Sequence, residues 1–171
     1  ESGQSISVVR HRRIWSNPVI WREMRTRAYG RRVIFIKLVY LFMAATIFYS
    51  AILTGDPGEL ILGMVSRPAF AFASLGILGL MLINAQAATS ITNERDGQTL
   101  DLLVATDISA KEFVYGKLGG VLYNTKELAL IPLAIATWFV VEGSMTLENG
   151  IYLGIGFLSL VSFAAMLGLH S

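Results

Sequence analysis

The residues of this chain that could do chemistry are charged side chains inside long apolar runs. Lys37 lies in one run, and Lys126 and Glu127 lie in another. An unpaired carboxylate at such a place costs about 2–3 kcal/mol to insert into a membrane. Glu127 is therefore predicted to pair with Lys37 across two helices and to fix one side of a helix bundle. Two alternatives remain, namely that the lysines snorkel to the surface or that the charges line a wet vestibule for a polar substrate.

Amide side chains accompany these charges. Asn84 and Gln86 lie near the end of the second apolar run, and Asn124 lies near the start of the third. With the basic N-terminus on the cytoplasmic side, all of these polar residues are predicted to lie in the cytoplasmic leaflet, roughly 5–10 Å deep. Pro132 cannot donate a backbone hydrogen bond, so it frees the carbonyl of Leu128 and is predicted to kink the third run.

A charged segment over 92–117 separates the second and third apolar runs, and it is longer than a simple turn requires. The pattern predicts a helix over 93–105, a break at 106–108, and a second helix that begins with the capping box Ser109-x-x-Glu112. Such an elbow could present a rigid surface to another protein. The alternative is a pair of membrane-parallel helices that only join two spans.

Composition excludes several classes of site. The chain has no cysteine, and its two histidines, His11 and His170, are far apart, which argues against a metal centre. Gly116-Lys117-Leu118 lacks the first glycine and the Ser/Thr of a phosphate-binding loop. The chain is therefore expected to be no enzyme and to bind no cofactor, and an intramembrane enzyme would lack recognisable catalytic residues.

The elements that position these residues are predicted to be membrane helices. The chain is 54% hydrophobic and 15% charged, and apolar windows of about 20 residues are typical of transmembrane helices. Its predicted fold class is an all-α polytopic membrane helix bundle. The predicted spans are 33–53, 69–91, 118–141 and 151–169.

The region before the first span is basic. Residues 1–16 are predicted to be a polar basic lead or a linker. Asn17-Pro18 is predicted to start an amphipathic helix over 18–29 that lies in the headgroup layer. The alternative is a soluble basic helix that packs on a partner. The residues assigned to this interfacial helix are Trp21, Arg22, Arg25 and Arg27.

The distribution of basic residues predicts the orientation. Nine of the fourteen Lys and Arg residues precede position 38, so the N-terminus is predicted to be cytoplasmic. Loops 54–68 and 142–150 would then face outward, and 92–117 would face inward. A membrane flank explains the basic cluster more simply than nucleic-acid binding, so no nucleic-acid partner is expected.

Small residues in the spans predict close helix contacts. Ala164 and Gly168 form a small-xxx-small pair in the fourth span, and Gly76 and Gly79 narrow the second. Serine and threonine residues in the spans are interpreted as helix-packing groups.

Two stretches resemble a known family. The segment 94–117 reads Glu94-Arg95-Asp96-x-x-Thr99-Leu100-Asp101-Leu102-Leu103 and continues as Ile108-Ser109-x-x-Glu112-Phe113-x-x-Gly116-Lys117. It resembles the first cytoplasmic loop of ABC-2 type transporter permeases. The segment 17–27 reads Asn17-Pro18-Val19-Ile20-Trp21-Arg22-Glu23-Met24-Arg25-Thr26-Arg27. It resembles the N-terminal sequence with which members of that family begin. Two positions depart from the family pattern, because the glycine before Thr99 is displaced to Gly97 and Asp107 stands where proline is common.

The resemblance implies a permease subunit in the bacterial inner membrane that exports an unidentified substrate. Its partners would be a cytoplasmic ABC ATPase, which holds ATP and Mg, a second permease subunit forming a homo- or heterodimer, and the lipid bilayer. The family usually has six spans, so this chain, which starts at Glu1, would be a fragment lacking the last two. The implied ATPase-coupling residues are Glu94, Arg95, Asp96, Thr99, Leu100, Asp101, Leu103, Ser109 and Glu112. The alternative function is a non-transporting membrane anchor that recruits a cytoplasmic partner through 92–117.

Overall fold

The computed structural model describes residues 30–53, 60–61, 63–96 and 110–170. These residues form four long helices and two short strands. The helices are α2 (Gly30–Leu53), α3 (Arg67–Asp96), α5 (Ala110–Val141) and α6 (Leu147–His170), and the strands are β1 (Leu60–Ile61) and β2 (Val65–Ser66). The predicted interfacial helix over 18–29 and the segment 97–109 lie outside the described residues.

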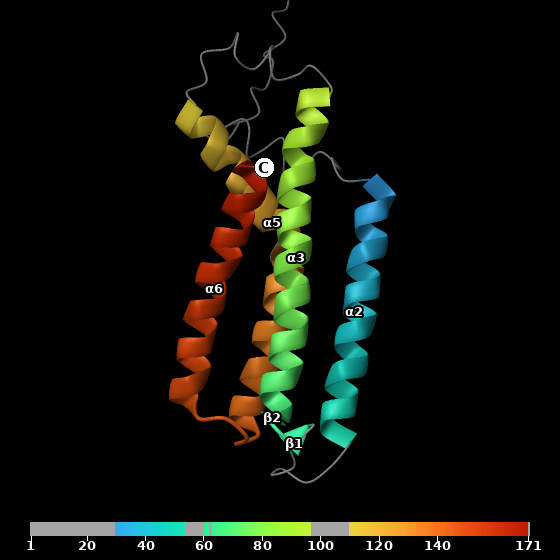
Figure 1. The fold of residues 1–171 in the computed structure, drawn as a ribbon, viewed down its shortest axis with the longest axis vertical. Coiled ribbons are helices and arrows are strands. Elements are labelled where there is room, and N and C mark those ends of the chain that lie inside the picture. The colour runs from blue at the N-terminus through green and yellow to red at the C-terminus, as the bar shows by residue number, and fades with distance from the viewer. Residues whose placement is uncertain (1–29, 54–59, 62, 97–109, 171) are drawn as a thin grey trace, which may run out of the picture.

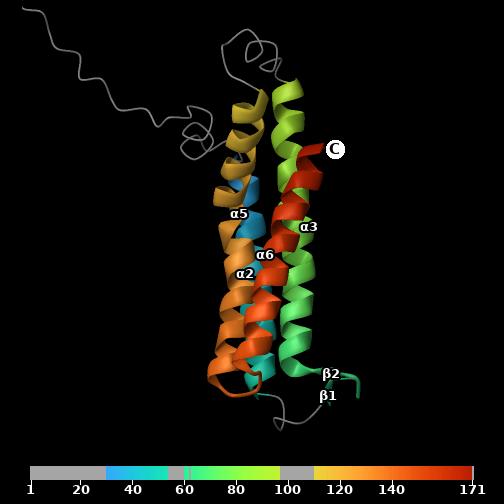
Figure 2. The ribbon, with the colours of Figure 1, turned by 90° about the vertical axis from the view of Figure 1, so that its left-hand side faces the viewer.

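The helices run up and down as a bundle, and α3 is its central member (Figure 1). α3 packs most extensively on α6 and α5, while α2 lies beside α3 and α5 with a smaller interface. Figure 2 shows that α3 and α5 project beyond the ends of α2 and α6 at the end of the bundle away from the strands. We call this end the loop end and the opposite one the hairpin end.

All four helices are long and apolar enough to cross a membrane, which supports the prediction of a multi-pass membrane protein. Their outward surfaces are rich in large apolar side chains, including Phe42 (74% exposed) on α2 and Phe163 (60%) on α6. A soluble monomer rarely exposes such a continuous apolar surface. The same surface suits hydrocarbon, where helices satisfy their own backbone hydrogen bonds.

The small residues of α3 and α6 let these helices approach closely, as the sequence predicts. A Cβ added to Gly168 would overlap the Asn84 carbonyl and lie 2.6 Å from the Ala87 Cβ. The Asn84 amide donates a hydrogen bond across the same contact to the Ala164 carbonyl, at 3.0 Å. Further along the same interface, a Cβ added to Gly76 of α3 would lie 3.2 Å from the ring of Phe157 of α6.

The predicted loop over 54–68 contains a short hairpin, and its last two residues already belong to α3. β1 pairs antiparallel with β2 in the register Leu60↔Ser66 and Ile61↔Val65, and Gly63 in the turn has a φ of 70°. α3 starts at Arg67, whose guanidinium donates to the Ala51 carbonyl in the last turn of α2, at 3.2 Å. A cation at this position complements the free carbonyls of a helix end.

The last connection is shorter than predicted, because α6 begins at Leu147 rather than at 151. The Thr146 hydroxyl accepts a hydrogen bond from the Asn149 backbone N–H, at 3.3 Å, as a helix N-cap does. Gly143, with a φ of 87°, follows the end of α5 and turns the chain. The link between the two helices is therefore short, with Gly143 after the end of α5 and the N-cap residue Thr146 before the start of α6.

The serine and threonine hydroxyls of the spans find hydrogen-bond acceptors within their own helices. Most of those described donate to the carbonyl four residues earlier in their own helix, as Thr125 does to Val121 at 2.8 Å and Ser159 does to Ile155 at 3.0 Å. This bond satisfies a hydroxyl without a second helix. Thr125 (1% exposed) and Ser90 (5%) are also buried inside the bundle, as helix-packing groups would be.

Candidate functional site

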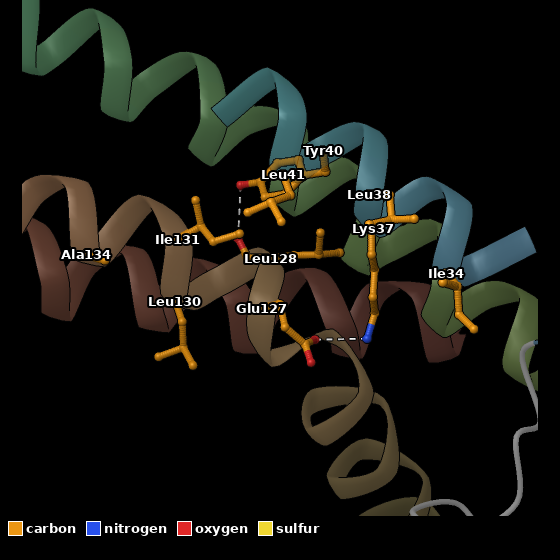
Figure 3. Close-up of a pocket in the computed structure, with 10 residues that line it drawn as sticks. All are labelled: Ile34, Lys37, Leu38, Tyr40, Leu41, Glu127, Leu128, Leu130, Ile131 and Ala134. Atoms are coloured by element: carbon orange, nitrogen blue, oxygen red, sulfur yellow. Dashed lines mark hydrogen bonds and ion pairs between the residues drawn. The ribbon is translucent and has the colours of Figure 1, made fainter. Parts of the chain in front are cut away.

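An ion pair joins α2 to α5 inside the predicted spans. The Lys37 Nζ lies 2.9 Å from the Glu127 Oε2, and the two side chains point toward each other across the helix interface (Figure 3). The pair predicted from the sequence is therefore present. Its physical basis is mutual neutralisation, since neither charge is well tolerated alone in an apolar surrounding.

The pair is not sealed inside the bundle. The Lys37 side chain is 27% exposed and the Glu127 side chain 46%. Lys37 follows the start of its span at Val33 by four residues, or about 6 Å along the helix. The two charges thus form a polar spot that is open to a ligand on its outer side.

One helical turn deeper, a tyrosine compensates for the backbone defect that Pro132 creates. The buried Tyr40 hydroxyl lies 3.1 Å from the Leu128 carbonyl, the group that Pro132 leaves without its helical N–H donor. The same hydroxyl lies 3.0 Å from the Leu75 carbonyl of α3, so it contacts two helices at once. Figure 3 shows that α5 changes direction near Glu127, five residues before Pro132 in the sequence.

Gly79 of α3 makes room for this contact. A Cβ at this position would lie 2.9 Å from the Leu128 carbonyl oxygen and 3.2 Å from the Tyr40 hydroxyl. Any larger residue would push α3 away from α5. Tyr40, Gly79 and Leu128 therefore form a junction of three helices directly beside the ion pair, which we call the tyrosine junction.

An apolar groove of about 390 Å³ runs between α2 and α5 beside the pair. We call it the α2–α5 groove. Apart from Lys37, Tyr40, Glu127 and Leu128, its lining consists of Ile34, Leu38, Leu41, Leu130, Ile131 and Ala134. The volume falls in the range of small-molecule pockets, which combine apolar walls with a few polar groups.

The other polar residues predicted from the sequence do not join this pair in one cluster. Lys126 is exposed and its Nζ lies over the Tyr123 ring, 4.2 Å from the centroid, in a cation–π contact. Asn84 bonds to α6, and Asn124 is partly buried on α5. Gln86 is 6% exposed, and neither polar atom of its side chain has a hydrogen-bond partner among the described residues.

Lys117 is a buried charge, although it lies in the charged segment 92–117 that the sequence predicts to connect two spans. It is only 3% exposed, and its Nζ lies 3.4 Å from the Ser90 carbonyl of α3. α5 begins at Ala110, earlier than the predicted span, so this lysine belongs to the helix interface. The signal that could have found it is the apolar run Phe113-Val114-Tyr115, which extends the third span toward its N-terminus.

The ends of the predicted coupling segment are helical. Glu94, Arg95 and Asp96 lie in the last turn of α3, and Glu112 lies in the first turn of α5. α5 starts directly after Ser109, where the capping box predicts a helix start. Outside the described residues lie Thr99, Leu100, Asp101, Leu103 and Ser109 of this segment, and Trp21, Arg22, Arg25 and Arg27 of the interfacial helix.

The described residues contain no group of three or more histidine, cysteine, aspartate or glutamate side chains able to hold a metal ion. What the described part of the bundle offers is one accessible ion pair, an adjoining apolar groove and a hydrogen-bonded helix junction. This combination suits recognition of an amphiphilic molecule and mechanical linkage between helices.

Comparison with known proteins identifies no relative. No family model, no curated protein and no solved structure matches the chain.

Proposed function

We propose that the protein is the membrane-spanning permease subunit of an ATP-driven transporter, in which a separate cytoplasmic ATPase drives movement of the helices. The proposal rests on the resemblance of 17–27 and 94–117 to ABC-2 type permeases. In this proposal the N-terminus and the loop end face the cytoplasm of a bacterial cell, and a second permease subunit completes the transporter.

One structural observation supports the proposal above the others. α3 and α5 each continue without a break from the hairpin end to the borders of the segment 97–109. They also form one of the two largest helix interfaces in the described bundle. A partner bound to the charged segment would therefore act on two long, packed helices, which is what mechanical coupling requires.

Buried contacts near the loop end strengthen this connection. Lys117 of α5 bonds the Ser90 carbonyl of α3, and both residues are nearly inaccessible. Displacement of one helix end would disturb the other, because a buried ammonium is costly to separate from its acceptor. Motion would then pass toward the tyrosine junction.

Charge reversal in the coupling segment tests the proposal. In membranes that contain the protein and its ATPase, Glu94→Lys or Asp101→Lys should lower transport at least about tenfold, the loss expected when one charge-assisted contact at the ATPase surface disappears. Stimulation of the ATPase by the membrane subunit should fall with it. The two readouts are substrate export and ATP hydrolysis, each normalised to folded protein in the membrane.

Glu148→Lys is the matched control, since Glu148 is an exposed acid in the first turn of α6 at the hairpin end. It should leave both readouts unchanged. Wild-type behaviour of both loop variants would refute the coupling surface. Co-purification of an ATPase that the protein never stimulates would favour the anchor function instead.

A further inference from the structure

The α2–α5 groove has the polarity of a membrane lipid. Lys37 and Glu127 mark its charged end, close to the start of the α2 span. Leu41 lies one helical turn deeper than Lys37, and Ala134 lies seven residues beyond Glu127, or about 10 Å along α5. Charge thus lies near one membrane surface, and the apolar walls continue toward the middle of the bilayer.

The charged end offers both signs side by side. Lys37 can donate to an anionic oxygen, and the Glu127 carboxylate, whose side chain is nearly half exposed, can accept from a cation with an N–H. A head that carries a phosphate next to a primary ammonium matches both groups. A trimethylated ammonium has no N–H to donate, and a glycerol head has no cation.

We propose that the α2–α5 groove binds a phospholipid of the phosphatidylethanolamine class. Its phosphate contacts the Lys37 ammonium and its own ammonium contacts the Glu127 carboxylate. The two lipid charges and the two protein charges then alternate in sign. One acyl chain lies along Leu38, Leu41 and Ile131 toward Ala134. This site is independent of any ATPase and of the direction of transport.

Lipid retention during purification tests the head group. The protein is reconstituted in vesicles with equal amounts of phosphatidylethanolamine, phosphatidylcholine and phosphatidylglycerol carrying the same acyl chains, then extracted, and the retained lipid is quantified by mass spectrometry. Phosphatidylethanolamine should exceed phosphatidylcholine about tenfold, the ratio expected for one charge-assisted hydrogen bond. Equal retention of the three lipids would overturn the proposal.

Substitutions separate the head site from the groove. Replacing Lys37 and Glu127 together by leucine keeps the helix contact apolar and should abolish the preference for phosphatidylethanolamine. The control Lys126→Leu removes an exposed lysine one residue from Glu127 and should keep the preference.

A second pair of variants tests the groove. Ala134→Trp should fill the groove and lower retention of all three lipids, while Ala73→Trp, on an exposed position of α3 outside the groove, should not. Each variant is first checked for wild-type thermal unfolding.

Two results would contradict the inference outright. An unchanged preference in the double-leucine variant would exclude the ion pair as the head-group site. A stable dimer that retains no lipid would assign the groove to a second copy of the chain. Because the assay contains no ATPase, its failure leaves the proposed transport function untouched, and failure of coupling leaves the lipid site untouched.

Discussion

At the scale of single residues, the tyrosine junction explains how the bundle tolerates a proline in its third long helix. Pro132 is fully buried and leaves the Leu128 carbonyl without its helical donor. The Tyr40 hydroxyl from α2 supplies a donor to that carbonyl. The defect in α5 thereby becomes a specific attachment point for α2, the helix with the smaller interfaces to its neighbours.

Removal of this hydroxyl should therefore destabilise the protein. Tyr40→Phe is expected to lower the free energy of unfolding by about 1–3 kcal/mol, since a buried carbonyl loses its partner. Pro132→Ala restores the helical N–H at that carbonyl, so Tyr40→Phe should cost about 1 kcal/mol less in the Pro132→Ala background. Unfolding by denaturing detergent in mixed micelles measures all four proteins of the cycle. Strictly additive effects would show that the hydroxyl does not compensate for the proline.

At the scale of elements, the contact of α3 with α6 depends on the absence of side-chain atoms at one position. A methyl group at Gly168 would meet the Ala87 side chain at 2.6 Å and the Ala88 backbone nitrogen at 3.1 Å. Backbone and Cβ atoms cannot rotate away, so the helices would have to separate. Separation would also stretch the hydrogen bond from Asn84 to Ala164.

Gly168→Ala is accordingly expected to reduce stability by about 1–3 kcal/mol through overpacking. Gly156→Ala is the matched control on the same helix, because an added Cβ there meets nothing within 4 Å. It should leave stability within about 1 kcal/mol of wild type or raise it, as alanine favours helix. Comparing thermal unfolding of the two variants in one detergent decides the point, and equal stabilities would mean that α3 and α6 do not pack as closely as described.

The sequence predicts the middles of these elements better than their ends. Hydropathy locates all four helices, and small residues such as Ala164 and Gly168 predict a close contact. Helix ends depend on capping and on neighbours, so α3 extends through Asp96 and α5 begins at Ala110, beyond the apolar runs. The burial of Lys117 and the identity of the carbonyls that accept from Tyr40 depend on how the helices are placed relative to one another. The hydrophobic periodicity of a single segment carries no information on that placement.

At the scale of the whole molecule, the polar features are distributed unevenly along the bundle. The ion pair, the buried Lys117 and the borders of the charged segment all lie from the middle of the bundle toward its loop end. The hairpin end carries the short strands, the tight link at Gly143, and the contact of Arg67 with the Ala51 carbonyl. Coupling and lipid binding, as proposed, would both use the half of the bundle that faces the proposed cytoplasmic side.

The proposed orientation can be tested directly, because the chain contains no cysteine and every introduced thiol is unique. Ser144, in the link before α6, and Lys111, in the first turn of α5, are both exposed and lie at opposite ends of the bundle. With the loop end inside, a membrane-impermeant maleimide added to intact cells should label Ser144→Cys and spare Lys111→Cys. Permeabilised cells should show both labelled.

Leu160→Cys supplies the control for membrane embedding. Leu160 is 52% exposed near the middle of α6, so water would reach its thiol if the apolar surface of the bundle faced solvent. In hydrocarbon the thiol stays protonated and unreactive, because the thiolate is the nucleophile. Leu160→Cys should therefore stay unlabelled in both conditions. Labelling of Lys111→Cys but not Ser144→Cys in intact cells would reverse the orientation, and labelling of Leu160→Cys would contradict the membrane location of α6.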